Sequence, residues 1–217
     1  MTTLLFCIPG KQFSDNWLHS WIDTISVLSK NNINWGISIA YDPVVYYARN
    51  RVLGGNNIAG KNQKPFQGTA NYDHMMWIDS DIVWRGEDIL KLISLNKPIV
   101  SGCYNMQNNS QYPIVENLDF NKLATQGTFD FMSKADMASK TTPFKASYVG
   151  FGFVAVQRGV YESIDYPLFR PRWVEHNNFS DFTAEDVGFC WTIQEKGFEI
   201  WVDPAVKVGH EKSVVLG

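Results

Sequence analysis

Asp79 and Asp81 stand one residue apart, directly after the apolar residues 75–78. That apolar run has the pattern of a strand buried on both faces, as in a parallel sheet covered by helices. If the extended conformation continues through Ser80, the two carboxylates project to the same side. Neighbouring carboxylates repel each other and are costly to bury, and a shared divalent cation compensates for both effects. The pair therefore predicts a metal site at a strand end; an acidic loop without metal is the alternative.

A second pair of acids, Glu185 and Asp186, lies at the expected start of a helix over residues 183–196. Acids in a first turn stabilise a helix through its dipole, and Thr183 with Asp186 has the spacing of a capping box, so a structural role is one interpretation. The other is that one carboxylate accepts a proton from a reacting hydroxyl. His210, near the end of the chain, is an ordinary surface or core histidine unless its context makes it a ligand.

The remaining pattern describes the scaffold that must position these groups. We expect strands at 4–8, 36–41, 75–78, 98–102, 146–156 and 198–202, and helices at 15–30, 44–53, 89–95, 160–164 and 183–196. The alternation of strand and helix predicts an open, mostly parallel α/β sheet, and ligands of such sheets collect outside the carboxyl ends of the strands. Residues 105–143 have poor periodicity and receive no assignment. Residues 56–71, rich in Gly, Asn, Gln and Lys, are expected to form a mobile loop placed like a lid.

Length and composition exclude several classes. The chain has 217 residues, enough for one domain with a substantial core, and its net charge of -3 lacks the basic excess of a nucleic-acid binder. No segment approaches the length that spans a bilayer, and no basic leader precedes the apolar start, so we expect neither a membrane span nor a signal peptide. Three widely spaced cysteines argue against a disulfide framework and for a cytoplasmic location. Oligomeric state does not follow from these data.

The order of these features resembles the GT-A class of nucleotide-sugar glycosyltransferases over nearly the whole chain. Asp79-Ser80-Asp81 is similar to the DXD motif of that class, residues 183–186 to the acidic start of its acceptor-side helix, and Val208-Gly209-His210 to its C-terminal metal-binding histidine. Within the class, the chain resembles the small glycosyltransferase domains of multidomain proteins from large algal viruses (chloroviruses), which would place it in the host cytoplasm.

The resemblance implies one GT-A-like domain over residues 1–217, with a nucleotide-binding half at about 1–105 and an acceptor-side half at about 106–217. The chain ends seven residues after His210, without the longer C-terminal segment of many members, which would fit a domain excised from a longer protein.

The resemblance also implies roles for individual residues. Asp81 would bind a divalent cation directly, His210 would complete the shell, and Asp79 would reach the ribose or the metal through water. An imidazole ligand favours Mn²⁺ over Mg²⁺. Asp186 would be the catalytic base, with Glu185 capping the helix or orienting the acceptor.

Further residues are candidates for the donor and acceptor sites. Arg49 would clamp a diphosphate or form a surface ion pair. Tyr104, at the end of a strand expected beside the acidic one, would contact the donor sugar or pack in the core, and Gly150 marks a close backbone approach. Aromatic and imidazole rings before the second acid pair would stack on acceptor sugar or pack the loop: Trp173, His176 and Phe179. The expected nucleotide pocket consists of Pro9, Lys11, Asp42 and Ser80.

Together these expectations describe a metal-dependent glycosyltransferase. It would move a hexose or deoxyhexose from a nucleoside-diphosphate sugar, with UDP as the expected nucleotide, to a glycan acceptor, with inversion. A sugar-1-phosphate nucleotidyltransferase is one alternative, because it also arranges paired acids around Mg²⁺, and a degenerate domain that binds nucleotide or sugar without turnover is another. The donor sugar, the acceptor and the linkage do not follow from the sequence, because pocket shape decides them.

Overall fold

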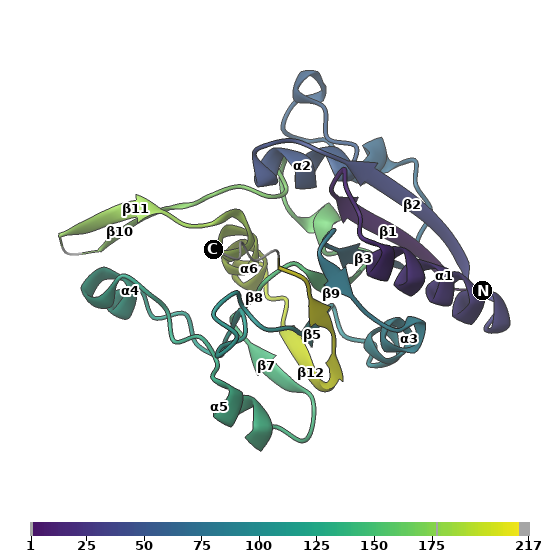
Figure 1. The fold of residues 1–217 in the computed structure, drawn as a ribbon. Coiled ribbons are helices and arrows are strands. Elements are labelled where there is room, and N and C mark those ends of the chain that lie inside the picture. Colours follow the sequence, from purple (N-terminus) through teal and green to yellow (C-terminus); the bar gives the residue numbers. More distant parts are fainter. Residues whose placement is uncertain (1, 177, 213–217) are drawn as a thin grey trace, which may run out of the picture.

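A seven-stranded sheet forms the centre of the computed structural model, which describes residues 2–176 and 178–212 (Figure 1). The strand order is β2-β1-β3-β9-β5-β12-β7. Five strands run in one direction, and β9 and β7 run against them. The strands are β1 (Thr3–Pro9), β2 (Asn34–Ala40), β3 (His74–Ile78), β5 (Ile99–Cys103), β7 (Phe144–Ala146), β9 (Phe153–Gln157) and β12 (Ile200–Lys207). The predicted mostly parallel α/β sheet is therefore confirmed.

Helices cover both faces of this sheet because alternate strand residues are apolar on each side. On one face, Met76 and Ile78 of β3 pack in a buried cluster with α1 (Asp15–Lys30) and α3 (Gly86–Ser94). On the other face, Met75 and Trp77 pack in a second cluster with α2 (Val45–Val52) and α6 (Glu185–Glu195). The uninterrupted apolar run before the acidic pair is thus explained by burial on both sides.

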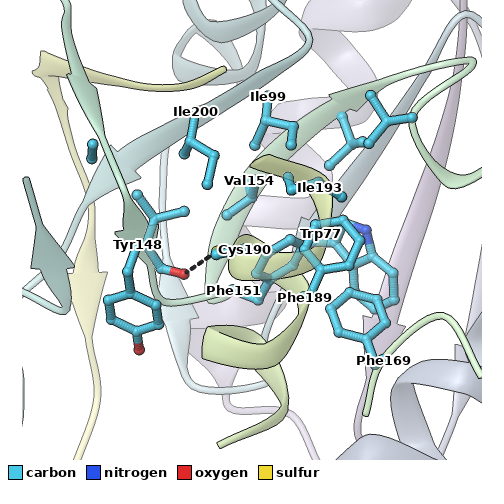
Figure 2. Close-up of a cluster of buried hydrophobic side chains, with 14 of the residues drawn as sticks. Trp77, Ile99, Tyr148, Phe151, Val154, Phe169, Phe189, Cys190, Ile193 and Ile200 are labelled. Carbon is cyan, nitrogen blue, oxygen red and sulfur yellow. Dashed lines mark hydrogen bonds between the residues drawn. The ribbon is translucent and has the colours of Figure 1, made fainter. Parts of the chain in front are cut away.

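The second cluster joins the acidic strand to helix α6 (Figure 2). The ring centroids of Trp77 and Phe169 are 5.1 Å apart, and those of Phe169 and Phe189 are 4.7 Å apart. Phe151 lies edge-on to Phe189 at 5.0 Å. Aromatic contacts of this kind bury large apolar areas and fix relative positions. They hold the end of β3 and the start of α6 in one rigid arrangement.

The remaining elements lie mainly in the second half of the chain. The hairpin of β10 and β11 extends away from the sheet, and α4 contacts it (Figure 1). The bounds are β4 (Ile82–Val83), β6 (Ile114–Val115), β8 (Tyr148–Val149), β10 (Trp173–His176), β11 (Phe179–Phe182), β13 (Gly209–His210), α4 (Phe120–Gln126), α5 (Lys134–Ser139), and the 3-10 helices η1 (Asn57–Ala59), η2 (Pro65–Gly68) and η3 (Tyr161–Ser163). The elements within residues 105–143 have no counterpart among the expectations.

The single strand predicted over residues 146–156 is divided into separate strands, because the chain changes partners in its middle. Strand β8 pairs with β6, whereas β9 pairs with β3 and β5. Between them the chain passes the Tyr104 side chain so closely that a Cβ added at Gly150 would lie 2.4 Å from its hydroxyl oxygen. Strand β9 also lies between β3 and β5, so the strand that precedes Tyr104 is not adjacent to the acidic strand.

Residues 56–71, expected to form a mobile loop, contain the short 3-10 helices η1 and η2. The buried Gln63 amide accepts a hydrogen bond from Asn56 N at 2.8 Å and donates to the carbonyls of Asn56 and Gly60. The Gln63 side chain thus holds this segment locally, and its mobility and its role as a lid stay predictions.

Across residues 2–176 and 178–212, no helix combines the length and apolar character needed to cross a bilayer. The three cysteines Cys7, Cys103 and Cys190 are free and buried.

Candidate active site

The acidic strand end is a turn rather than a continued strand. Strand β3 ends at Ile78, and Ile82 N donates to Asp79 O at 3.2 Å. The extended conformation therefore does not continue through Ser80, and the two carboxylates meet different partners although both line the cleft described below. Asp79 faces Arg49, whose Nη1 and Nη2 lie 3.2 and 3.3 Å from its two carboxylate oxygens. Asp81 instead faces the C-terminal segment of the chain.

That C-terminal segment brings His210 to Asp81. Strand β13 pairs antiparallel with β4, with His210 opposite Ile82, and Nε2 of His210 lies 3.2 Å from Asp81 Oδ2. The other ring nitrogen, Nδ1, lies 2.7 Å from the carbonyl of Asn105. A carbonyl can only accept, so Nδ1 carries a hydrogen. Nε2 can then donate to the Asp81 carboxylate only in the protonated ring, in which both nitrogens carry hydrogen, whereas in the neutral ring Nε2 has the lone pair that a metal ligand needs. Tyr104 packs edge-on against the same ring at 5.2 Å.

The electrostatics of this pair favour a charged carboxylate. Burial raises the pKa of Asp81, but hydrogen bonds from His210 and Lys212 outweigh it and hold the pKa at about 2. The hydrogen bond to Asp81 in turn raises the pKa of His210. Asp81 is therefore an ionised oxygen donor throughout the physiological range.

Asp81 and His210 fit a divalent cation as two protein ligands. The carboxylate of Asp79 is already occupied by Arg49, and the described residues contain no group of three His, Cys, Asp or Glu side chains close enough to hold a metal. Mg²⁺ and similar cations commonly take one or two protein ligands and complete their shell with water and substrate phosphates. The hydrogen bond that orients the His210 ring is the outer-shell support that such a ligand needs.

A cleft of about 410 Å³ opens beside this strand end, a volume in the range of small-molecule sites. Of the residues expected to bind the donor, it brings together Pro9, Lys11, Asp42 and Ser80 with both aspartates of the acidic strand end, whereas Arg49, Tyr104 and Gly150 are not in its lining. The ammonium of Lys11 lies 4.2 Å from the centroid of the Tyr41 ring, another part of the lining. The carboxyl ends of β1 and β3 therefore form one wall of the cleft, as expected for an α/β sheet.

Arg49 is a buried link between the two acid pairs. Besides its two-point contact with Asp79, its Nε lies 3.1 Å from Glu185 Oε1. The side chain is only 4% exposed, and the rings of Trp77 and Phe151 lie 5.5 and 5.7 Å from its guanidinium carbon. The expected alternative of a surface ion pair is wrong, because α2 directs this side chain into the core. The guanidinium is not part of the cleft lining.

Asp186 lies beside this link in an environment that disfavours charge. Burial, followed by repulsion from Glu185, raises the pKa of Asp186 to about 6. The hydroxyl of Tyr148 donates to its Oδ2 at 2.9 Å, and its own neighbour Val187 N donates to Oδ1 at 2.8 Å. A carboxylate with a pKa near neutrality can take up and release a proton under ordinary conditions.

The predicted capping box at α6 is wrong. The N-cap residue is Ala184, which makes no side-chain hydrogen bond, and Thr183 Oγ1 instead accepts from Arg172 N at 2.9 Å. The Thr183 hydroxyl thus contacts the backbone at Arg172 rather than the first turn of α6. The structural explanation for Asp186 as a cap partner is correspondingly weaker.

Other candidate residues lie apart from the cleft lining. Tyr104 is buried, accepts from Gly152 N at 3.0 Å and supports the His210 ring, while Gly150 provides the space for Tyr104. In the projecting hairpin, Trp173 is 51% exposed and stacks edge-on with Phe182 at 5.0 Å. The remaining hairpin candidates are a His176 ring that contacts Asn121 and a half-buried Phe179.

Sequence reasoning missed Lys212, Tyr148 and Phe182. Lys212 had a signal, because a residue two places after His210 in extended chain lies on the same side. Tyr148 and Phe182 had none, since their partners come from distant parts of the chain.

Comparison with known proteins agrees with the fold. No family model and no curated protein matches the sequence. Among solved structures, A197 from STIV matches with a TM-score of 0.55 and 18% identity, over 100% of this chain and 97% of that one. A Drosophila beta-1,4-galactosyltransferase 7 mutant in complex with manganese, UDP-Gal and xylobiose matches with a TM-score of 0.53 and 11% identity, over 98% and 72%. GalNAc-T7 with UDP, GalNAc and Mn²⁺ matches with a TM-score of 0.56 and 10% identity, over 98% of this chain and 43% of that one.

These likenesses define a GT-A-like α/β fold. Identities of 10–18% carry the architecture alone, and this chain spans less than half of the GalNAc-T7 chain.

Proposed function

We propose that the protein is a metal-dependent glycosyltransferase that moves a hexose or deoxyhexose from a UDP-sugar to a glycan acceptor with inversion. The observation that carries this proposal is the cleft in which Lys11, Asp42 and Ser80 meet the acidic strand end, with the Asp81–His210 pair beside it. Two of the similar structures are complexes with a uridine nucleotide and manganese, by their descriptions, which supports the same class of ligand here.

The residues divide the reaction between two sides. The cleft residues would bind the nucleotide, and Asp81 with His210 would hold Mn²⁺ or Mg²⁺. The cation, when bound, supplies the positive charge that stabilises the departing diphosphate. Asp79, held by Arg49, would accept hydrogen bonds from the ribose through water. These residues lie within 1–105 apart from His210, which supports the proposed division into a nucleotide-binding half and an acceptor-side half.

On the acceptor side, Asp186 would act as the base. The acceptor oxygen bonds to the anomeric carbon while the bond from that carbon to the diphosphate oxygen breaks, and the electron pair leaves with UDP. The acceptor proton passes to the Asp186 carboxylate. One displacement of this kind inverts the anomeric centre. Rings in the hairpin before α6, Trp173 and Phe179 together with His176, would contact the acceptor glycan.

A turnover assay tests the class. The protein is incubated with a panel of nucleotide sugars and candidate glycans, with Mn²⁺ or with a chelator, and both UDP and pyrophosphate are measured. Release of UDP that stops on chelation is the expected result. Pyrophosphate would indicate the nucleotidyltransferase alternative. Metal-dependent nucleotide binding without any turnover across the panel would indicate the degenerate binding domain.

A further inference from the structure

Glu211, the residue directly after His210, is held by contacts with two parts of the chain. Glu211 N donates to the backbone carbonyl of Asp81 at 2.8 Å. The Glu211 carboxylate accepts from Ser14 Oγ at 2.5 Å and from Asn16 Nδ2 at 2.7 Å, both at the start of α1. Because the backbone and the side chain of Glu211 are both held, the position of the following residue, Lys212, is restricted. These contacts place Lys212 beside Asp81, the carboxylate that is proposed to hold the metal.

Lys212 occupies the position of a cation on that carboxylate. Its Nζ lies 2.6 Å from Asp81 Oδ2, the same oxygen that faces His210 Nε2 at 3.2 Å. A divalent cation bound to Oδ2 would be repelled by an ammonium at this distance, because both are positive and the carboxylate carries only one negative charge. Binding of the metal therefore requires Lys212 to move.

The Lys212–Asp81 contact is of a kind that separates at low cost. The two side chains are 38% and 39% exposed, and ion pairs accessible to water contribute little net stability. A lysine has a long, flexible stem that lets the ammonium move while the anchored backbone stays in place. Once released, the charge remains two residues from His210, beside the site where the diphosphate would meet the metal. An ammonium is a suitable point charge for phosphate oxygens.

We propose that Lys212 is a tethered cation with two positions: on Asp81 in the empty site, and on the diphosphate of the donor once a divalent cation has taken Asp81. This inference rests on the proposed function. It predicts that Lys212 opposes the binding of the metal alone and assists the binding of the nucleotide with the metal. No covalent bond is made or broken in the exchange: Asp81 loses the hydrogen bond from Lys212 and gains the cation as its counter-charge.

Calorimetry on the full chain tests both effects with Lys212→Met, which keeps the length of the stem and removes the charge. Mn²⁺ alone should bind the variant more tightly than the wild type, and UDP at saturating Mn²⁺ should bind it more weakly. The loss of UDP affinity should be about tenfold, the size of one charge-assisted hydrogen bond. The gain in Mn²⁺ affinity should be smaller, about two- to fivefold, because the ion pair that the metal replaces is exposed. Lys212→Arg should keep UDP affinity near the wild-type value, and Lys207→Met, at an exposed position of β12, should change neither affinity.

The opposite directions make the result specific. If Lys212→Met weakens both ligands, weakens Mn²⁺ alone, or leaves either affinity unchanged, the exchange is refuted while the proposed function stands. If the wild-type protein binds no UDP in the presence of Mn²⁺, the proposed function fails and this inference fails with it.

Discussion

Asp81 and Asp186 are aspartates in opposite electrostatic surroundings. Asp81 lies at the end of a strand, where hydrogen bonds from His210 and Lys212 outweigh partial burial and lower its pKa to about 2. Asp186 lies in the first turn of a helix, where burial and the neighbouring Glu185 raise its pKa to about 6. The same side chain thus becomes a permanent anion in one place and a proton acceptor in the other. This difference in surroundings, rather than in residue type, is the reason we propose metal binding for Asp81 and base chemistry for Asp186.

Arg49 connects these two regions. Its guanidinium contacts Asp79 on the strand side and Glu185 on the helix side, so each acid pair has one member that is tied to Arg49 and one that is left for chemistry. Asp81 and Asp186 are therefore the members of the two acid pairs that Arg49 does not contact through hydrogen bonds.

The largest effect is expected from Asp186→Asn. The amide of asparagine cannot take up the proton of the attacking hydroxyl group, so turnover should fall by about 10²–10⁴-fold, the usual contribution of a general base. UDP affinity in the presence of Mn²⁺ should change little, because Asp186 lies outside the cleft lining. Steady-state kinetics together with calorimetry measure the two quantities. Glu185→Gln should reduce turnover less. Near-normal turnover of Asp186→Asn, or a product with the anomeric configuration of the donor, would contradict the assignment.

Arg49→Met should break the connection between the two regions. It leaves Asp79 and Glu185 without their shared cation, and loss of one partner from a buried ion pair costs about 3–5 kcal/mol. Urea unfolding gives the free energy of unfolding directly. The matched control is Arg51→Met, two residues further along, whose side chain is 60% exposed and pairs with Asp42; an exposed pair should contribute about 1 kcal/mol or less. Equal losses in the two variants would show that the buried link has no special role.

Asp81→Asn tests the strand side. Loss of a charged ligand should reduce UDP affinity in the presence of Mn²⁺ by roughly 10–100-fold or more, since even outer-shell changes reach that size. The fold should be retained, because Asp81 is 39% exposed. Calorimetry with and without Mn²⁺ measures the difference, and Asp130→Asn, at another exposed aspartate, is the control. Unchanged metal-dependent binding would remove Asp81 from the site.

The smallest effect concerns the pH dependence of turnover, which should follow the ionisation of Asp186. Only ionised Asp186 accepts a proton, so turnover should rise about tenfold per pH unit below the pKa of about 6 and become constant above it. The Tyr148 hydroxyl donates to Asp186 and lowers its pKa, so Tyr148→Phe should move the midpoint to higher pH. Tyr47→Phe, on an exposed position of α2, should leave the midpoint in place. A pH profile of kcat that is flat from pH 5 to 8, or a downward shift in Tyr148→Phe, would contradict this description of Asp186.

Local sequence determined the elements that depend on local patterns. The run before Asp79 alternates between two buried faces, and helix α1 begins where Ser14 accepts from Trp17 N. The cleft also followed from sequence, because the carboxyl ends of parallel strands meet at one edge and bring Lys11, Asp42 and Ser80 together. In each case the cause is a periodicity or a topological rule that acts within or between neighbouring elements.

Only the tertiary structure decided which partner each charged residue meets. Strand β9 enters between β3 and β5 from a distant part of the chain, and Glu185 reaches Arg49 from 136 residues away. Lys212 similarly reaches Asp81 across 131 residues. Such contacts depend on long-range packing, in which loop closure and the burial of the aromatic cluster fix positions that no local pattern encodes. A pKa depends on all charges within a few ångströms, so the sequence could name the acids of this site but not the protonation behaviour that separates Asp81 from Asp186.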